Sequence, residues 1–199
     1  MDIGACESFR FSGPIGLQDG QLEEGLTGLH LLDSSLAAAL DPTGLTLTKA
    51  RAQGKRGGSI EASGFYGFDN SGAVVLQLDQ LDAFSRSDIT ASLSGAAEID
   101  RRDRLTRVQG DLKINQARVN LSKLPGAGYT LLDVEFADEL KDVDSQEPRR
   151  EAIALNLDIG ADRGIFVTGP GIDSEWGLDA RITGPAGQPQ VIGQANLVR

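Results

Sequence analysis

The 199-residue sequence is poor in the side chains that most metal centres and covalent catalysts require. It contains one cysteine, Cys6, and one histidine, His30. A single cysteine cannot form an internal disulfide, and one histidine with one cysteine leaves a zinc ion short of ligands. Asp33 and Ser34 follow His30 too closely for the three side chains to meet as a catalytic triad, so we interpret His30 as an outward-facing strand residue. We therefore expect no cofactor, no bound metal and no enzymatic activity, with paired carboxylates of the glycosidase type as the one enzymatic alternative left open.

Basic clusters and long apolar runs are also scarce. Lys and Arg number 19 against 29 Asp and Glu, which gives a net charge of −10. Nucleic-acid binding needs clustered basic side chains that neutralise phosphates, so we expect no nucleic-acid partner. No apolar run approaches the roughly 18 residues of a transmembrane helix, and the start Met1-Asp2 lacks the basic region of a signal peptide. Any export signal or membrane anchor is therefore expected outside this chain.

Alternation of apolar and polar side chains is the strongest pattern that is present. Apolar residues occupy every second position over 89–99, 108–114 and 191–197, and smaller residues do so over 62–68. This period of two is typical of strands with one buried face. The three longer segments carry a glycine at the same phase, at Gly95, Gly110 and Gly193. Because glycine inside a strand marks a bend, a bulge or a close backbone approach, a stack of such strands is expected to curve.

Further strands, almost all short, are predicted over residues 45–52, 74–78, 153–159, 165–168 and 178–183, with Gly-, Pro- and Asp-containing turns between them. The one helix considered covers residues 34–40, where Ser34 can cap an Ala-rich turn, although Leu36 and Leu40 also suit a strand. Residues 141–151 are charged, contain Pro148 and lack periodicity, which indicates an exposed loop within a single domain over 1–199. The acidic residues between 133 and 144 match no EF-hand spacing and are interpreted as a solvated face.

One-sided strands with almost no helix to cover them are compatible with three all-β folds. These are a sandwich, a closed barrel, and an elongated curled sheet or half-pipe related to solenoids. The units are irregularly spaced, so the sequence has no strict solenoid repeat.

The carboxyl end carries a motif that narrows this choice. It consists of an acidic–Arg pair at Asp162-Arg163, an apolar strand ending in Gly169-Pro170-Gly171, the turn Ile172-Asp173-Ser174-Glu175-Trp176, and an alternating strand over 177–184. Residues 161–184 with this motif resemble the TamB family, and residues 188–199 resemble the next repeat of that family. Looser matches occur at 13–20, at 108–114, and from Leu124-Pro125 to residues 132–135. The resemblance spans nearly the whole chain, and the 162–184 block is its most specific part.

The resemblance implies a non-enzymatic periplasmic module of the translocation and assembly machinery of Gram-negative bacteria. Members of this family are anchored in the inner membrane, partner an outer-membrane barrel protein called TamA, and are similar to AsmA-like bridge proteins. The implied fold is a curled sheet, or β-taco, with an apolar concave groove. The implied partners are phospholipid acyl chains, or unfolded outer-membrane proteins that pair with the edges of the sheet. A secreted β-solenoid that acts as an adhesin or processes polysaccharide remains the alternative.

The candidate groove-lining residues are the apolar members of the alternating strands. They are predicted to bind lipid or an added strand. Trp176 is interpreted as an aromatic residue packed at a strand start. The candidate groove residues are Val74, Leu76, Leu78, Ile89, Leu93, Ile99, Val108, Leu112, Ile114, Ile153, Leu155, Leu157, Ile182, Val191 and Leu197.

Overall fold

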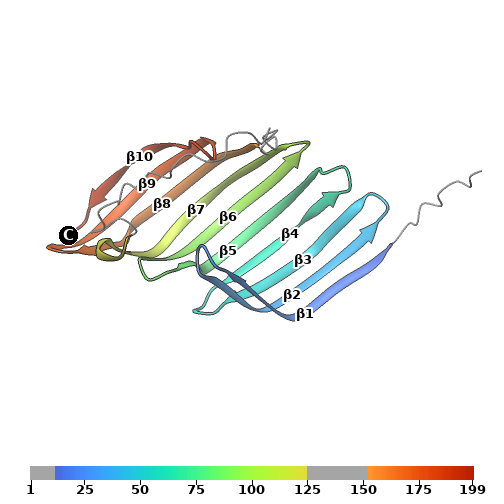
Figure 1. Ribbon diagram of the computed structural model, residues 1–199, viewed down its shortest axis with the longest axis horizontal. Helices are drawn as coiled ribbons and strands as arrows, with labels where there is room; N and C mark the ends of the chain where they lie inside the picture. Colours follow the sequence, from blue (N-terminus) through green and yellow to red (C-terminus); the bar gives the residue numbers. More distant parts are fainter. Residues whose placement is uncertain (1–11, 125–151) are drawn as a thin grey trace, which may run out of the picture.

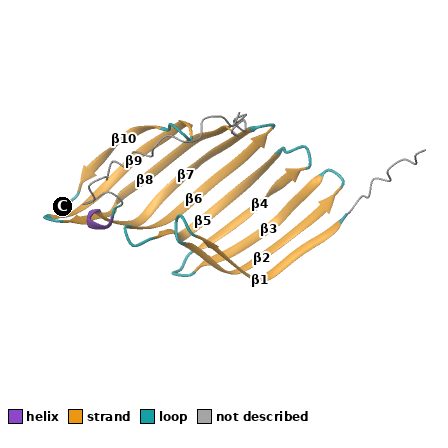
Figure 2. Cartoon of the chain, in the orientation of Figure 1, coloured by secondary structure: helices purple, strands orange, loops and turns teal. Residues whose placement is uncertain are grey.

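The fold is a single curled β-sheet, seen in a computed structural model that describes residues 12–124 and 152–199. Ten strands lie side by side in the order in which the chain makes them (Figure 1). Strands account for most of the described chain, with one short 3-10 turn, η1 (Leu121–Lys123), after the seventh strand (Figure 2). The strands are β1 (Gly13–Glu24), β2 (Leu29–Asp41), β3 (Gly44–Gly54), β4 (Ser59–Gly67), β5 (Gly72–Ser85), β6 (Ile89–Arg102), β7 (Leu105–Asn120), β8 (Ala152–Gly169), β9 (Ile172–Pro185) and β10 (Gln190–Leu197).

Neighbouring strands are antiparallel except at one junction. β7 and β8 run parallel, from Leu105 opposite Ala152 to Asn120 opposite Thr168. Residues 121–151 therefore connect opposite ends of these two strands. Within the described residues, β1 and β10 form the two edges and do not pair with each other. The sheet is thus neither a closed barrel nor one half of a sandwich, which confirms the all-β half-pipe expectation.

Several predicted elements differ in detail from those observed. Residues 34–40 belong to strand β2, so the helix prediction was wrong. The strands are also longer than expected, because the segments 153–159 and 165–168 are two parts of the single strand β8. The turn at 41–44 forms as predicted, with the Asp41 carboxylate accepting hydrogen bonds from the Thr43 and Gly44 amides at 2.7 and 3.1 Å. The charged segment 141–151, the acidic residues 133–144 and Cys6 lie outside the described residues.

A line of β-bulges crosses the sheet and bends it; we call this line the crease. Asp19, Asp33 and Gln80 adopt positive φ angles of 56°, 48° and 48° on β1, β2 and β5. The pairing register shifts at the same places, and it shifts again between Lys113 and Ala117 of β7, opposite a shift between Ala161 and Ile165 of β8. Because a bulge bends its strand and increases the local twist, aligned bulges fold the sheet across its strands.

The turn between β1 and β2, residues 25–28, reaches past the short β3–β4 hairpin to the end of β5 (Figure 1). The Ser85 amide donates to the Thr27 carbonyl at 2.8 Å, and Arg86 Nη1 donates to the Leu26 carbonyl at 3.2 Å. Arg86 also forms two hydrogen bonds, at 2.8 and 2.9 Å, with the buried carboxylate of Asp88. The Arg86 guanidinium lowers the pKa of Asp88 below its usual value. These bonds hold β1 and β2 in their bent form.

The sheet has very little conventional core. Among the described residues, the buried apolar side chains are six alanines and Leu81, which is 1% exposed. The larger aliphatic side chains of one face are only partly covered, because none of the described strands packs on them as a second layer. An uncovered apolar face of this extent indicates a binding surface.

Candidate functional site on the concave face

The pairing register collects apolar residues on one face of the sheet. Directly paired residues on neighbouring strands point to the same side. One such row crosses all ten strands and contains only aliphatic residues and glycine. It runs Leu17, Leu36, Ala50, Ala62, Leu76, Ala97, Gly110, Leu157, Ile182 and Val191.

The next row along the strands faces the other way and is mostly polar. It runs Arg51, Glu61, Gln77, Ala96, Asp111, Asp158, Arg181 and Ile192. Arg181 forms a two-pronged ion pair with Asp158, with Nε–Oδ1 and Nη2–Oδ2 distances of 2.6 and 2.9 Å. This hydrogen bonding lowers the pKa of Asp158. Exposed pairs of this kind add little stability but keep the outer face solvated.

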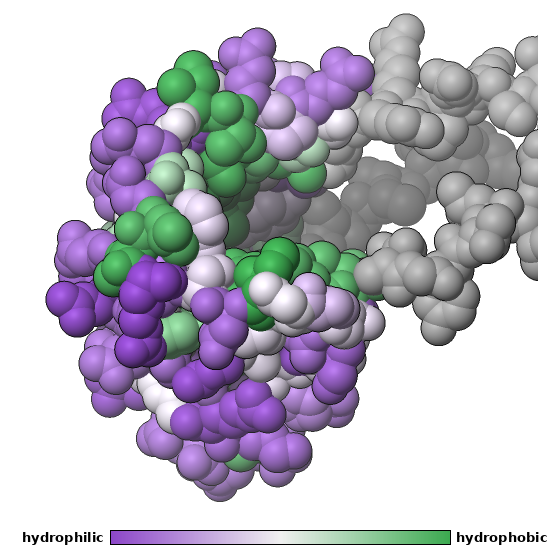
Figure 3. Space-filling view, turned by 90° about the vertical axis from the view of Figure 1, so that its left-hand side faces the viewer, coloured by the Kyte–Doolittle hydropathy of each residue, from purple (hydrophilic) through white to green (hydrophobic). Residues whose placement is uncertain are grey.

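The apolar rows line the inside of the curl. Figure 3, which looks along the stack of strands, shows hydrophobic residues around a hollow and hydrophilic residues on the outer surface. Nine spacings between ten strands of about 4.8 Å each make this hollow roughly 45 Å long. The inner face is therefore an extended apolar surface that no other strand of the described chain covers.

Every candidate groove residue lies on this inner face. Val74, Ile99, Val108 and Leu155 form one row, next to the row that contains Leu76, Leu157, Ile182 and Val191. Leu78 and Leu112 both pair with Gly95, and Leu93 pairs with Ile114. Ile89, Ile153 and Leu197 share the face by strand alternation, at the ends of their strands. The role of these residues in binding lipid or an added strand stays a prediction.

Sequence reasoning missed the amino-terminal part of this face. Leu17, Leu22, Leu31 and Leu36 line an apolar pocket of about 290 Å³ with Ile60 and the alanines of β3 and β4. The signal was present in the alternation of Leu29, Leu31 and then Leu36, Ala38, Leu40, but the helix prediction over 34–40 obscured it. A second apolar pocket of about 390 Å³ lies at the other end, between β8, β9 and β10.

Trp176 lines this second pocket with Ile165 and Leu178. Its indole Nε1 donates to the Ser174 hydroxyl at 2.9 Å, which fixes the ring against the strand. The ring sits within β9, which begins at Ile172, so it is a wall of the pocket as well as a packed strand residue.

Polar chemistry is sparse around this face. His30 lies on β2 with Nε2 3.1 Å from Glu23 Oε1, and it does not approach a catalytic arrangement. In residues 12–124 and 152–199, no group of three or more histidine, cysteine or acidic side chains is arranged to hold a metal ion. The same ranges contain no helix that is long and apolar enough to cross a membrane.

The Ser34 hydroxyl can be used to test whether water reaches the inner face. Its hydroxyl is buried beside the amino-terminal pocket and has no hydrogen-bond partner. An unsatisfied buried hydroxyl is costly, so Ser34→Ala should raise the free energy of unfolding by about 1 kcal/mol. Ser35, the next residue, is exposed, and Ser35→Ala should change it by less than about 0.5 kcal/mol. Urea unfolding of both variants measures the difference, and equal stabilities would show that the Ser34 hydroxyl is satisfied in solution.

The fold and this face together define a class of protein: an elongated, open β-sheet with a long apolar concave face. A family model, the TamB C-terminal domain, matches residues 48–199. The chain belongs to the TamB family, which makes it a bacterial envelope protein of the translocation and assembly module type. Comparisons with curated proteins and with solved structures gave no match.

Proposed function

We propose that the concave face carries phospholipid acyl chains through the periplasm, between the inner and outer membranes, without catalysing a reaction. The observation that supports this most strongly is the row of aliphatic residues and glycine that crosses all ten strands on the inner face. In the full-length protein, an anchor in the inner membrane and a TamA-like barrel in the outer membrane would fix the two ends of the path.

The physical need for such a path comes from the cost of exposing hydrocarbon to water. Burial of one methylene is favourable by about 0.8 kcal/mol of transfer free energy, so the transfer of a sixteen-carbon chain into water costs on the order of 10 kcal/mol. An apolar trough that covers one side of the chain removes much of this barrier. The headgroup can remain in water along the open side, because no strand among residues 12–124 and 152–199 packs over the inner face.

The half-exposed aliphatic side chains supply the required surface. Leu17 is 51% exposed, and Leu22 is 54% exposed. In a protein with a conventional core such residues would be covered by another layer, whereas here a ligand can cover them. The mostly polar outer face and the net charge of −10 favour hydration of the outer surface, while the inner face stays apolar.

Photo-crosslinking tests this proposal. A photoreactive amino acid at Leu112 or Leu155 should form adducts with phospholipid in cells. The matched controls are Lys113 and Asn156, the next residues along the same strands, which face outward and should give no lipid adducts. Equal yields at inward and outward positions, or no lipid adduct at any inward position, would refute the proposal that the concave face carries lipid.

A second candidate function is favoured by the contrast between the two edges of the sheet. β10 pairs with β9 in unbroken register, its residues are all exposed, and Gln190–Leu197 contains no charge or proline. β1 carries Pro14, two register shifts and the acidic residues Asp19 and Glu23. Natural edges are protected by such features, so β10 is the edge suited to accept a strand of an unfolded outer-membrane protein. A crosslinker at Gln194 that captures barrel proteins, with no lipid adduct at Leu112, would favour this function.

A further inference from the structure

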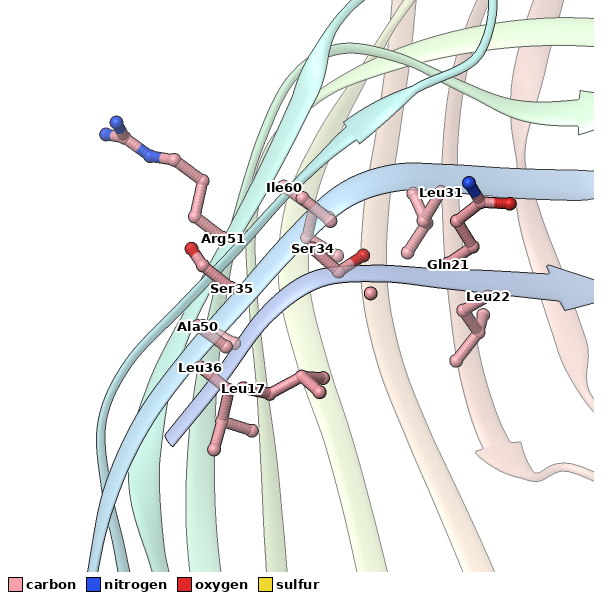
Figure 4. Close-up of a pocket in the computed structure, with 13 residues that line it drawn as sticks. Leu17, Gln21, Leu22, Leu31, Ser34, Ser35, Leu36, Ala50, Arg51 and Ile60 are labelled. Carbon is pink, nitrogen blue, oxygen red and sulfur yellow. The ribbon is translucent and has the colours of Figure 1, made fainter. Parts of the chain in front are cut away.

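The amino-terminal pocket is a distinct recess in the inner face, about 290 Å³ in volume. Figure 4 shows it in the bend of β1 and β2, with Leu17, Leu22 and Leu31 directed toward the inside. The side chains of Ser35 and Arg51, which also border it, point away to the outer surface (Figure 4). The lining is therefore almost entirely aliphatic.

The recess results from a match between small and large residues on neighbouring strands. β3 contributes Ala50 and Ala52, and β4 contributes Ala62, so the floor is shallow at these three alanines, and Ile60, which pairs with Ala52, borders it. Leu36 of β2 pairs with Ala50, and Leu17 of β1 pairs with Leu36, so a wall of larger side chains stands beside the shallow floor. The crease then turns the rest of β1 over this floor, because the pairing register breaks between Leu17 and Gly20.

The bent strands are tied in this position at their tip. The hydrogen bonds from Ser85 to Thr27 and from Arg86 to Leu26 fix the β1–β2 turn to the end of β5. The recess is thus held in place by hydrogen bonds between strands and is not a gap between independent hairpins.

We propose that this recess binds the terminal part of a single saturated acyl chain, about ten carbons long. This inference rests on the proposed lipid function and adds to it a defined site with a limited chain length. A methylene occupies roughly the 30 Å³ that one water molecule takes in the liquid, so 290 Å³ accommodates about ten of them.

A hydrocarbon fits this recess better than a polypeptide does. An extended peptide brings an amide and a carbonyl at every residue, and each of these needs a partner when it is buried. The backbone groups of β2, β3 and β4 around the recess already pair within the sheet. An acyl chain has no polar groups to satisfy, and it covers the exposed surfaces of Leu17 and Leu22.

Chain-length dependence is the direct test. Saturated carboxylates of six to fourteen carbons, kept below their micellar concentrations, are titrated into the methyl-labelled protein and followed by NMR. Inside the recess each added methylene should tighten binding about fourfold. Beyond about ten carbons the gain should fall below twofold per methylene, because the rest of the inner face covers the chain on one side only.

The position of the bound chain is a second result of the same titration. Methyl shifts should appear first at Leu22 and Leu31 and reach Leu112 only with the longer chains. A uniform slope over the whole series, or equal shifts at Leu112 with the short chains, would overturn the proposal.

A matched pair of variants separates the recess from the rest of the inner face. Ala62→Phe fills the floor of the recess and should weaken decanoate binding at least tenfold. Ser63→Phe places the same side chain on the outer face, one residue along β4, and should change binding less than twofold. Ala50→Leu is a milder filling variant, and thermal melting of all three verifies that they fold.

Crosslinking at Leu112 in the Ala62→Phe background distinguishes the two proposals. We expect lipid adducts there to persist. Unchanged decanoate affinity in Ala62→Phe, with Leu112 adducts retained, would overturn only the proposal that the recess binds an acyl chain. A retained length dependence without any Leu112 adduct would support acyl-chain binding in the recess and overturn lipid transport along the concave face.

Discussion

Replacement of Gly95 by alanine should destabilise the sheet by about 3 kcal/mol, which is a large fraction of the stability of a typical domain. Gly95 lies in the middle of β6 with a φ angle of 133°, a backbone conformation that residues with a side chain rarely adopt. A Cβ atom there would lie 2.2 Å from the Asp111 carbonyl oxygen of β7. Because that oxygen belongs to the backbone, relief of the clash requires the two strands to move apart.

Gly160→Ala is the matched control for this substitution. Gly160 is on β8, its φ angle is not positive, and an added Cβ would meet no atom within 4 Å. Its replacement should change the free energy of unfolding by less than about 0.5 kcal/mol. Urea unfolding followed by circular dichroism gives both values, and equal stabilities of the two variants would show that β6 and β7 are not as close as the structure has them.

The structure explains why glycine occupies the same position in the three alternating segments of the sequence, at Gly95, Gly110 and Gly193. Gly110 would place a Cβ 2.4 Å from the Ala96 carbonyl oxygen, and Gly193 would place one 2.3 Å from that of Asp179. Of the bend, bulge and close approach that the sequence left open, the structure shows close approach at all three positions. Side chains are excluded there because neighbouring strands come together on the concave side.

The inner face could be predicted because the period-two pattern holds over the strand segments between bulges. From residue 89 to 99, for example, one parity is apolar throughout, and it forms the inner side of β6. The crease could not be predicted, because it depends on Asp19, Asp33 and Gln80 in positive-φ conformations. Most residues of these types have ordinary φ angles, so their identity carries little signal about a bulge.

The helix prediction over residues 34–40 failed because of tertiary context. The segment Ser-Ser-Leu-Ala-Ala-Ala-Leu favours a helix on local propensity. In the fold it pairs along both sides, with β1 and with β3, and this pairing outweighs the local preference. The amino-terminal pocket was missed for a related reason, since the crease brings its lining residues together from β1 to β4.

The family motif at the carboxyl end can be interpreted in terms of the same crease. Asp162, Arg163 and Gly164 form the bulge of β8, with Gly164 at a φ angle of 92°. Gly177 of β9 lies opposite, where an added Cβ would be 2.6 Å from the Asp162 carbonyl oxygen. Glu175 is buried and pairs with Arg199 at 3.0 Å between Oε2 and Nε. The motif therefore specifies a bend in the sheet and supplies part of the second pocket through Trp176.

Leu81→Ala should cost about 3 kcal/mol, because it removes the large side chain that fills the crease. Leu81 is 1% exposed and follows the Gln80 bulge on β5. It packs beside Gly54, where an added Cβ would lie 3.1 Å from its Cδ1 atom, and it pairs with Leu93 of β6. Its loss leaves a cavity at the point where the sheet bends, and the tightly paired backbone there has little freedom to close it.

Leu76→Ala is the comparison that separates the crease from the concave face. Leu76 lies five residues earlier on the same strand, on the inner face and only partly buried. Since water already reaches its side chain, its truncation should cost about 1 kcal/mol or less. The expected effect on ligand is the reverse, with Leu76→Ala weakening acyl-chain binding at mid-trough more than its small loss of stability suggests. Denaturant midpoints and lipid adduct yields from one set of variants decide this. Equal destabilisation by the two substitutions would mean that the inner face is packed like a core, and an apolar face that is already packed has no surface left for a lipid.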